Sequence, residues 1–167
     1  MKVFITGRPH SGKSIVLEKT IELLKQKGLK VGGFITPEIV EGGNRVGFSI
    51  KDVYSGEMGV LASVDFKIGP KLGKYTVAVE EFERVALKAL DFAVEKCDVI
   101  AVDEIGKMEF FSEKFKQKLT EILLIDKRFI AVLHRNYVKQ FKDYGEVIEI
   151  TAKNRNQLPE KIVKLIS

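Results

Sequence analysis

This sequence has a single cysteine and lacks tryptophan and long hydrophobic runs. Its 167 residues include one cysteine, Cys97, and no tryptophan, which excludes an internal disulfide and a cysteine-based metal cluster. No apolar run reaches the roughly 18 residues that a membrane-spanning helix needs. The N-terminus also lacks the apolar stretch and cleavage site of a signal peptide. We therefore expect a soluble, cytoplasmic protein that makes no membrane contact and in which Cys97 serves packing.

The charge of the chain is basic, but the basic residues are not concentrated. The formal net charge is +5, and basic surfaces attract polyanions such as nucleic acids. Lysines nevertheless occur in every segment and alternate with glutamates, as at 80–84 and 113–116, a pattern typical of solvated helix faces. Nucleic acid is therefore not an expected partner. The richness in lysine and glutamate, with little asparagine and glutamine, favours a thermophilic source.

Apolar periodicity predicts alternating strands and helices, with no repeat, low-complexity tract or linker. We expect a single domain, 1–167, with a three-layer α/β fold in which a mostly parallel central sheet is extended by an antiparallel β-meander at about 31–79. The expected strands lie at 2–6, 31–39, 45–53, 58–62, 75–79, 98–102, 129–133 and 147–150. The expected helices lie at 13–27, 82–92, 112–125 and 137–141, and a last helix carries Leu158, Ile162 and Leu165. The apolar face of the second helix is formed by Phe82, Val85, Ala86, Ala89 and Phe92.

Residues 7–14 match the phosphate-loop pattern G-x-x-x-x-G-K-[ST] at every required position. They are Gly7, Arg8, Pro9, His10, Ser11, Gly12, Lys13 and Ser14. Glycines let backbone N–H groups approach phosphate oxygens, Lys13 adds a charge at the β- and γ-phosphates, and the Ser14 hydroxyl can bind Mg²⁺. For Arg8 and His10 the pattern implies only backbone contacts. Since a strand precedes the motif and a helix follows it, we expect a nucleotide site rather than an incidental glycine-rich turn.

Two carboxylates follow a continuous apolar run. The run at 99–102 is typical of a central parallel strand, and Asp103 and Glu104 come directly after it. Ligands of open α/β sheets bind beyond the carboxyl ends of the strands, so Asp103 should lie beside the phosphates as a Mg²⁺ partner. Glu104 can accept a proton from water that attacks the γ-phosphate. We therefore expect both acids in the nucleotide site, with Glu104 as the catalytic base.

Longer segments carry a resemblance to a known family. They are Asp-Glu-Ile-Gly-Lys-Met-Glu-Phe-Phe-Ser at 103–112, Gly-Phe-Ile-Thr-Pro-Glu at 33–38, Asn-Arg-Val-Gly-Phe at 44–48, Gly-Lys-Tyr at 73–75 and Thr-Ala-Lys-Asn-Arg-Asn-Gln-Leu at 151–158. Over essentially its whole length the chain resembles the small nucleoside-triphosphatases first described from hyperthermophiles, which include the human cancer-related nucleoside-triphosphatase.

The resemblance implies a RecA-like fold and Mg²⁺-dependent hydrolysis of ATP, GTP, CTP and UTP. It implies that Asn154 and Arg155 form a wall of the nucleobase pocket, and Gly106 is counted with the nucleotide-binding residues. Val40 stands where relatives often carry an arginine, and Pro37 replaces a polar residue. If that arginine contributes to nucleotide binding in relatives, this chain lacks it.

Several polar residues have two open interpretations. Arg135 follows an expected strand, where a cation supplied in cis could stabilise γ-phosphate charge, but it could equally be solvated at a loop start. Thr36 and Glu38 could face the γ-phosphate or simply end a strand. Lys107 and Glu109 could form an ion pair or belong to the site.

Four residues are expected to be structural. Asn156 should cap the last helix, with Pro159 in its first turn. Phe110 and Phe111 should enter the core.

Three functions compete at this point. The first is hydrolysis of nucleoside triphosphates, with Glu104, Lys13 and Arg135 as catalytic residues and a monomer as the favoured state. The second is a small-molecule kinase that uses the same loop, and the third is a nucleotide-dependent RNA-binding switch. An acid directly after Asp103, and the absence of an arginine-rich lid, favour water as the phosphoryl acceptor.

Overall fold

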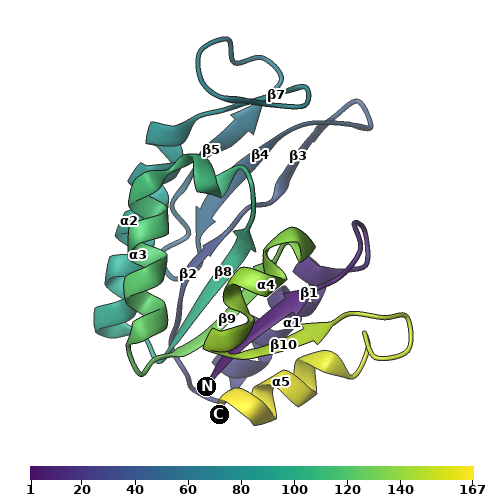
Figure 1. Ribbon diagram of the computed structural model, residues 1–167, viewed down its shortest axis with the longest axis vertical. Coiled ribbons are helices and arrows are strands. Elements are labelled where there is room, and N and C mark those ends of the chain that lie inside the picture. The colour runs from purple at the N-terminus through teal and green to yellow at the C-terminus, as the bar shows by residue number, and fades with distance from the viewer.

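A ten-stranded mixed sheet organises the computed structural model, which describes residues 1–167 (Figure 1). The strands are β1 (Lys2–Thr6), β2 (Val31–Ile35), β3 (Glu38–Glu41), β4 (Asn44–Asp52), β5 (Met58–Ser63), β6 (Lys71–Leu72), β7 (Tyr75–Val77), β8 (Val99–Ile105), β9 (Arg128–Leu133) and β10 (Glu146–Glu149). The helices are α1 (Lys13–Gln26), α2 (Val79–Lys96), α3 (Glu113–Leu124), α4 (Val138–Phe141) and α5 (Leu158–Ile166), with 3-10 turns η1 (Glu109–Phe111), η2 (Arg135–Tyr137) and η3 (Lys142–Tyr144).

The sheet has a parallel part and an antiparallel part. Its strand order is β10-β1-β9-β8-β2-β4-β5-β7-β6, with β3 paired to β4. The five strands from β10 to β2 pair in parallel. The strands from β4 to β6 pair antiparallel, as does β3 with β4. The antiparallel part thus begins after β2, later than the start at residue 31 that the sequence predicted, and β6 is an additional strand.

Helices cover both faces of the parallel strands, which confirms the predicted three-layer α/β fold. Helices α2 and α3 pack on one face and α1 and α5 on the other (Figure 1). Strand β8 shows why its sequence is apolar without alternation. Ile100 and Val102 belong to the core under α2 and α3, whereas Val99 and Ala101 belong to the core under α1 and α5. A strand buried on both faces needs apolar side chains at every position.

Strand β2 packs closely against helix α2 and strand β8. A Cβ atom on Gly32 would lie 2.7 Å from the Ala93 Cβ atom. A Cβ atom on Gly33, whose φ is +105°, would lie 1.9 Å from the Ala101 carbonyl oxygen. Only glycine fits such an approach. As expected, Cys97 is a buried, free thiol in this region.

Two predictions about aromatic side chains were wrong. Phe92, expected on the buried face of α2, is 37% exposed and packs at a tilt against Tyr54, with 4.7 Å between ring centroids. Phe111, expected in the core with Phe110, is 39% exposed because η1 turns the two neighbouring rings in different directions. Phe110 does pack against the core. None of the helices combines the length and the apolar character that crossing a lipid bilayer would require.

Candidate active site

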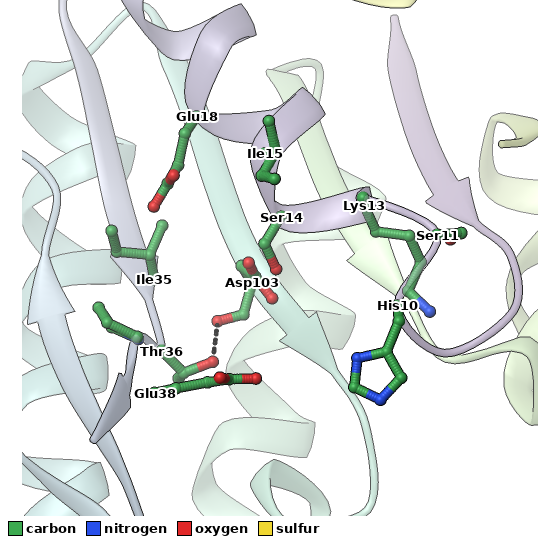
Figure 2. Close-up of a pocket in the computed structure, with 12 residues that line it drawn as sticks. His10, Ser11, Lys13, Ser14, Ile15, Glu18, Ile35, Thr36, Glu38 and Asp103 are labelled. Carbon is green, nitrogen blue, oxygen red and sulfur yellow. Dashed lines mark hydrogen bonds between the residues drawn. The ribbon is translucent and has the colours of Figure 1, made fainter. Parts of the chain in front are cut away.

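The phosphate loop joins β1 to α1 with backbone conformations that glycine favours. Gly7 has a φ of 156° and Gly12 a φ of 94°, and His10 takes a φ of 62°, a left-handed conformation that is uncommon for a residue with a Cβ atom. Helix α1 begins at Lys13, directly after the loop. Its free N–H groups and positive dipole end therefore face the same space as the loop (Figure 2).

The Lys13 ammonium group is held by the loop itself. Its Nζ atom donates to the Gly7 carbonyl at 3.0 Å and to the Arg8 carbonyl at 3.2 Å. Neither partner is a carboxylate, so a phosphate would not have to break an ion pair to attract this group. The Ser11 hydroxyl is buried without a hydrogen-bond partner, and a Cβ atom on Gly7 would lie 2.9 Å from it.

Two adjoining cavities surround the loop, with volumes of about 550 and 330 Å³. They share the loop, the first turn of α1 and the end of β2. The residues that line both are His10, Lys13, Ser14, Thr36, Glu38 and Asp103. The larger cavity adds Ser11, Gly12, Ile15, Glu18, Ile35 and Pro37. The smaller adds Gly7, Pro9, Arg45, Phe48, Glu104, Val132, His134 and Arg135. The structure therefore brings the predicted loop, the acid pair and Arg135 together.

Asp103 lies at the base of both cavities beside Ser14 (Figure 2). Burial raises the pKa of Asp103 to about 6, against the opposing effects of a Ser14 hydrogen bond and the Lys13 charge. Thr36 donates from its hydroxyl to the Asp103 carbonyl at 3.0 Å, which joins β2 to β8 at this point. Ser14 and Asp103 thus present two hard oxygen donors to one space.

Glu104, which lines the smaller cavity, lies next to a second acid, the buried Glu109. Burial, then the charge of Asp103, raises the pKa of Glu104 to about 7, opposed by Lys13. Glu109 is only 3% exposed, and burial followed by the charge of Glu104 raises its pKa well above the ordinary value. A Cβ atom on Gly106 would lie 2.9 Å from Glu104 Oε1 and 3.1 Å from Glu109 Oε1.

This arrangement changes the interpretation of two residues. Gly106 borders the two carboxyl groups and is not among the residues that line either cavity at the loop. The ion pair considered between Lys107 and Glu109 does not form; Glu109 is instead a buried acid without a cationic partner. The backbone of Glu109 and of Gly106 lowers the pKa of this carboxyl, against the larger raising effects of burial and Glu104.

Arg135 lies just beyond β9, next to His134, on the wall of the smaller cavity. No hydrogen bond or ion pair holds its guanidinium group. His134 accepts a hydrogen bond from the Asn136 N–H at Nδ1, and burial followed by the charge of Lys13 lowers its pKa. Arg8 contributes its backbone carbonyl to Lys13, and its side chain lines neither cavity.

The segment before α5 lies against the outside of the phosphate loop. Arg155 packs on Gly12, where a Cβ atom would lie 3.0 Å from its Cδ atom, and donates to the Ser11 carbonyl at 3.5 Å. The Asn154 amide accepts from the Thr151 N–H at 2.8 Å and donates to the Glu149 carbonyl. Neither Asn154 nor Arg155 lines the two cavities.

The prediction of Asn156 as the cap of the last helix was wrong. Helix α5 begins at Leu158 after Gln157, and no side chain caps it. Asn154 instead uses its amide to close the preceding turn. Pro159 does lie in the first turn, as expected.

Sequence reasoning missed four polar or aromatic residues that line the cavities, namely Glu18, Arg45, Phe48 and His134, besides the aliphatic Ile15, Ile35 and Val132. Glu18 lies one helical turn after Ser14, so helical periodicity could have identified it. Arg45 and Phe48 reach the loop through the pairing of β4 with β2 and β3. No local pattern shows that approach.

The site geometry agrees with comparisons to known proteins. A family model described as NTPase matches residues 2–163. The chain belongs to the NTPase family. It is similar to nucleoside-triphosphatase THEP1 of Methanocaldococcus jannaschii, with 46% identity over 99% of this chain and 97% of the relative. It is 41% identical to nucleoside-triphosphatase THEP1 of Methanosarcina acetivorans over 97% of this chain and 94% of the relative.

Solved structures extend the similarity to the fold. The crystal structure of THEP1 from the hyperthermophile Aquifex aeolicus matches with a TM-score of 0.86 and 30% identity over 100% of this chain and 99% of that chain. The solution structure of a human cancer-related nucleoside triphosphatase matches with a TM-score of 0.83 and 33% identity over 99% of this chain and 97% of that chain. The expected resemblance is thus confirmed, and this NTPase is a nucleotide-binding hydrolase.

Proposed function

We propose that this NTPase hydrolyses ATP, GTP, CTP and UTP to nucleoside diphosphate and phosphate, with Mg²⁺, through the site around the phosphate loop. One observation supports the proposal above all. Lys13 and Ser14, which can hold the terminal phosphates, line the same 330 Å³ cavity as Glu104, the residue suited to activate water. A phosphate-binding device and a general base therefore meet in one space.

Binding of the triphosphate rests mainly on the loop. Backbone N–H groups of the non-proline residues at 7–14 and the N-terminus of α1 surround the β-phosphate, and Lys13 turns from the Gly7 and Arg8 carbonyls towards the β- and γ-phosphates. Charge-assisted hydrogen bonds of this kind are worth roughly 1.5–3 kcal/mol each.

Mg²⁺ fits the oxygen donors at this position. Ser14 and Asp103 supply a hydroxyl and a carboxylate on the wall of both cavities. The chain has no group of three or more His, Cys, Asp or Glu side chains that could hold a metal by themselves. Such a partial donor set suits Mg²⁺, which keeps waters and substrate phosphates among its ligands. When bound there, the ion neutralises negative charge on the phosphate oxygens.

Glu104 acts as the general base. A water molecule beside the γ-phosphate gives a proton to the Glu104 carboxylate while its oxygen forms a bond to the γ-phosphorus. The bond from this phosphorus to the β,γ-bridging oxygen breaks, and its electron pair stays on the nucleoside diphosphate. Because burial raises the pKa of Glu104 to about 7, the group is basic enough to take the proton near neutral pH. Arg135 can approach the γ-phosphate from β9 as a second cation.

Broad base acceptance follows from the same geometry. Only two of the residues that line the larger cavity are hydrophobic, Ile15 and Ile35, and none is phenylalanine, tyrosine or tryptophan. Contacts to phosphates do not distinguish bases. We propose that Arg155, which packs on Gly12 of the loop, and its neighbour Asn154 border the base without selecting it. All these groups come from one chain, so we propose the monomer as the active form.

A nucleotide panel tests the proposal. Purified protein with excess Mg²⁺ should release phosphate from ATP, GTP, CTP and UTP with kcat/KM values within about 100-fold of each other, equivalent to roughly 2.7 kcal/mol. The same panel with EDTA should show no turnover above background. No phosphate release from any of the four would contradict the proposal. A preference well beyond 100-fold for one base would contradict its broad-specificity part.

A further inference from the structure

Arg45 lies across the smaller cavity from the phosphate loop. It belongs to β4, in the antiparallel part of the sheet, and lines the 330 Å³ cavity opposite Gly7 and Lys13. Glu104 borders the same cavity. A cation at this position faces the outer end of a triphosphate whose β-phosphate is held by the loop.

The surroundings of Arg45 fix its guanidinium group from several directions. Nε donates to the Tyr75 hydroxyl at 2.8 Å, and Nη1 donates to Glu38 Oε1 at 3.2 Å. The guanidinium carbon lies 5.0 Å from the centre of the Phe48 ring and 5.7 Å from that of Tyr75. Tyr75 is itself buried, at 7% exposure. An arginine packed against two neighbouring aromatic rings loses less conformational freedom when a ligand binds.

The hydrogen bonds of Arg45 leave room for an anion. A guanidinium group has five N–H donors, and here Nη2 has no partner. Glu38, which occupies Nη1, is itself exposed, with its side chain 53% accessible, and it also lines the cavity. An exposed ion pair of this kind contributes little stability, so a doubly charged phosphate can displace the carboxylate.

Arg135 on the opposite wall lacks these features. It lines the same cavity, but no side chain holds its head group. Of the two arginines that line this cavity, Arg45 is therefore the one whose guanidinium group the fold holds in place.

We propose that Arg45 binds the γ-phosphate of the nucleoside triphosphate directly, with Glu38 giving way to phosphate oxygens at Nη1 and Nη2. This inference rests on the proposed function, because it places the triphosphate on the loop. In this role Arg45 stabilises the charge that moves during transfer of the phosphoryl group to water. Tyr75 is the positioning residue that holds Nε.

The test compares nucleotides with and without a γ-phosphate. Arg45→Gln and Arg45→Lys are measured by calorimetry for affinity to Mg²⁺ complexes of ADP and of a non-hydrolysable ATP analogue, and by phosphate release for turnover. Arg84→Gln is the matched control, since Arg84 pairs with Glu57 and Glu81 on the surface and lines neither cavity. Circular dichroism and Tm establish folding of each variant.

The expected result is a loss of affinity for the ATP analogue and of turnover, but not of affinity for ADP. Arg45→Gln should weaken binding of the ATP analogue at least about 10-fold and lower kcat at least about 100-fold. The affinity for ADP should stay within about twofold of the parent value, because only a triphosphate reaches Arg45. Arg45→Lys should not restore kcat, since lysine lacks the planar fork. Tyr75→Phe, which keeps the ring, should lower kcat by roughly 3- to 10-fold without affecting ADP affinity.

Equal loss of ADP and analogue affinity, or no loss of either, would overturn the assignment. If Arg45→Gln does not fold, Tyr75→Phe and Arg45→Lys test the assignment through the same comparison of affinity for the ATP analogue with affinity for ADP. If the parent protein binds the analogue but releases no phosphate, the proposed function fails. The difference in affinity between the analogue and ADP then still tests whether Arg45 binds the γ-phosphate.

Discussion

The pH dependence of turnover follows from the position of Glu104. Its carboxyl is mostly removed from water at the end of β8 and lies next to Asp103, and these two effects raise its pKa to about 7, against the opposing charge of Lys13. A general base works only when it is deprotonated. The rate should therefore rise with pH through the neutral range, which an ordinary glutamate would not produce.

The magnitude can be worked out from that pKa. With a pKa of about 7, half of the free enzyme is active at pH 7. The deprotonated fraction falls to about one-tenth at pH 6 and to about one-hundredth at pH 5. The value of kcat/KM at each pH should therefore be the same fraction of its plateau at high pH. Since kcat/KM reports groups of the free enzyme, the pKa of the unliganded site is the appropriate one.

The assay is steady-state phosphate release from ATP with Mg²⁺ in excess, between pH 5 and 9. Glu38→Gln serves as the control, because Glu38 is an exposed carboxyl of the same cavities, and its profile should keep an inflection near pH 7 even if the plateau changes. A parent profile that is flat from pH 5.5 to 8 would refute the assignment of a buried base.

Two further predictions concern the charges around the site. Lys13→Ala should weaken Mg²⁺-ATP binding at least about 30-fold, or roughly 2 kcal/mol, because its Nζ is the cation built into the loop; calorimetry that finds unchanged affinity would remove the phosphate-loop assignment. Burial raises the pKa of Glu109 in the folded state, so its contribution to stability is complete below the unfolded pKa and is lost as pH rises towards the folded one. Glu109→Gln should therefore raise Tm at pH 8 and do so less at pH 5, and an equal or lower Tm at pH 8 would contradict this reasoning.

Much of the fold could be predicted because its signals are local. The order of strands and helices follows from apolar periodicity, and the double-sided burial of β8 explains why residues 99–102 are all apolar. Less could be predicted where pairing between distant segments decides the structure. Residues 31–35 were assigned to the meander, but β2 pairs in parallel with β8 and belongs to the central sheet. Phe111 carries an apolar side chain that the turn η1 leaves 39% exposed.

The candidate site divides in the same way. The residues of the loop and the acid pair are contiguous in sequence, and motif spacing is enough to place Lys13 and Asp103 at one cavity. Arg45 reaches that cavity only because β4 pairs with β2 and because Tyr75, on β7, supplies a hydroxyl. The burial of Glu109 likewise depends on the packing of η1. Such contacts join segments whose proximity exists only in the folded chain.

The most direct test of the account is to separate nucleotide binding from hydrolysis with Glu104→Gln. The amide keeps the shape of the side chain but cannot accept a proton, whereas Lys13, Ser14 and Asp103 remain in the cavity to hold the nucleotide. A positioned base contributes roughly 100- to 10,000-fold to the rate. The account predicts Mg²⁺-ATP affinity within about threefold of the parent protein and turnover at least about 100-fold lower. Hydrolysis at near the parent rate would show that Glu104 is a structural acid and contradict the central claim.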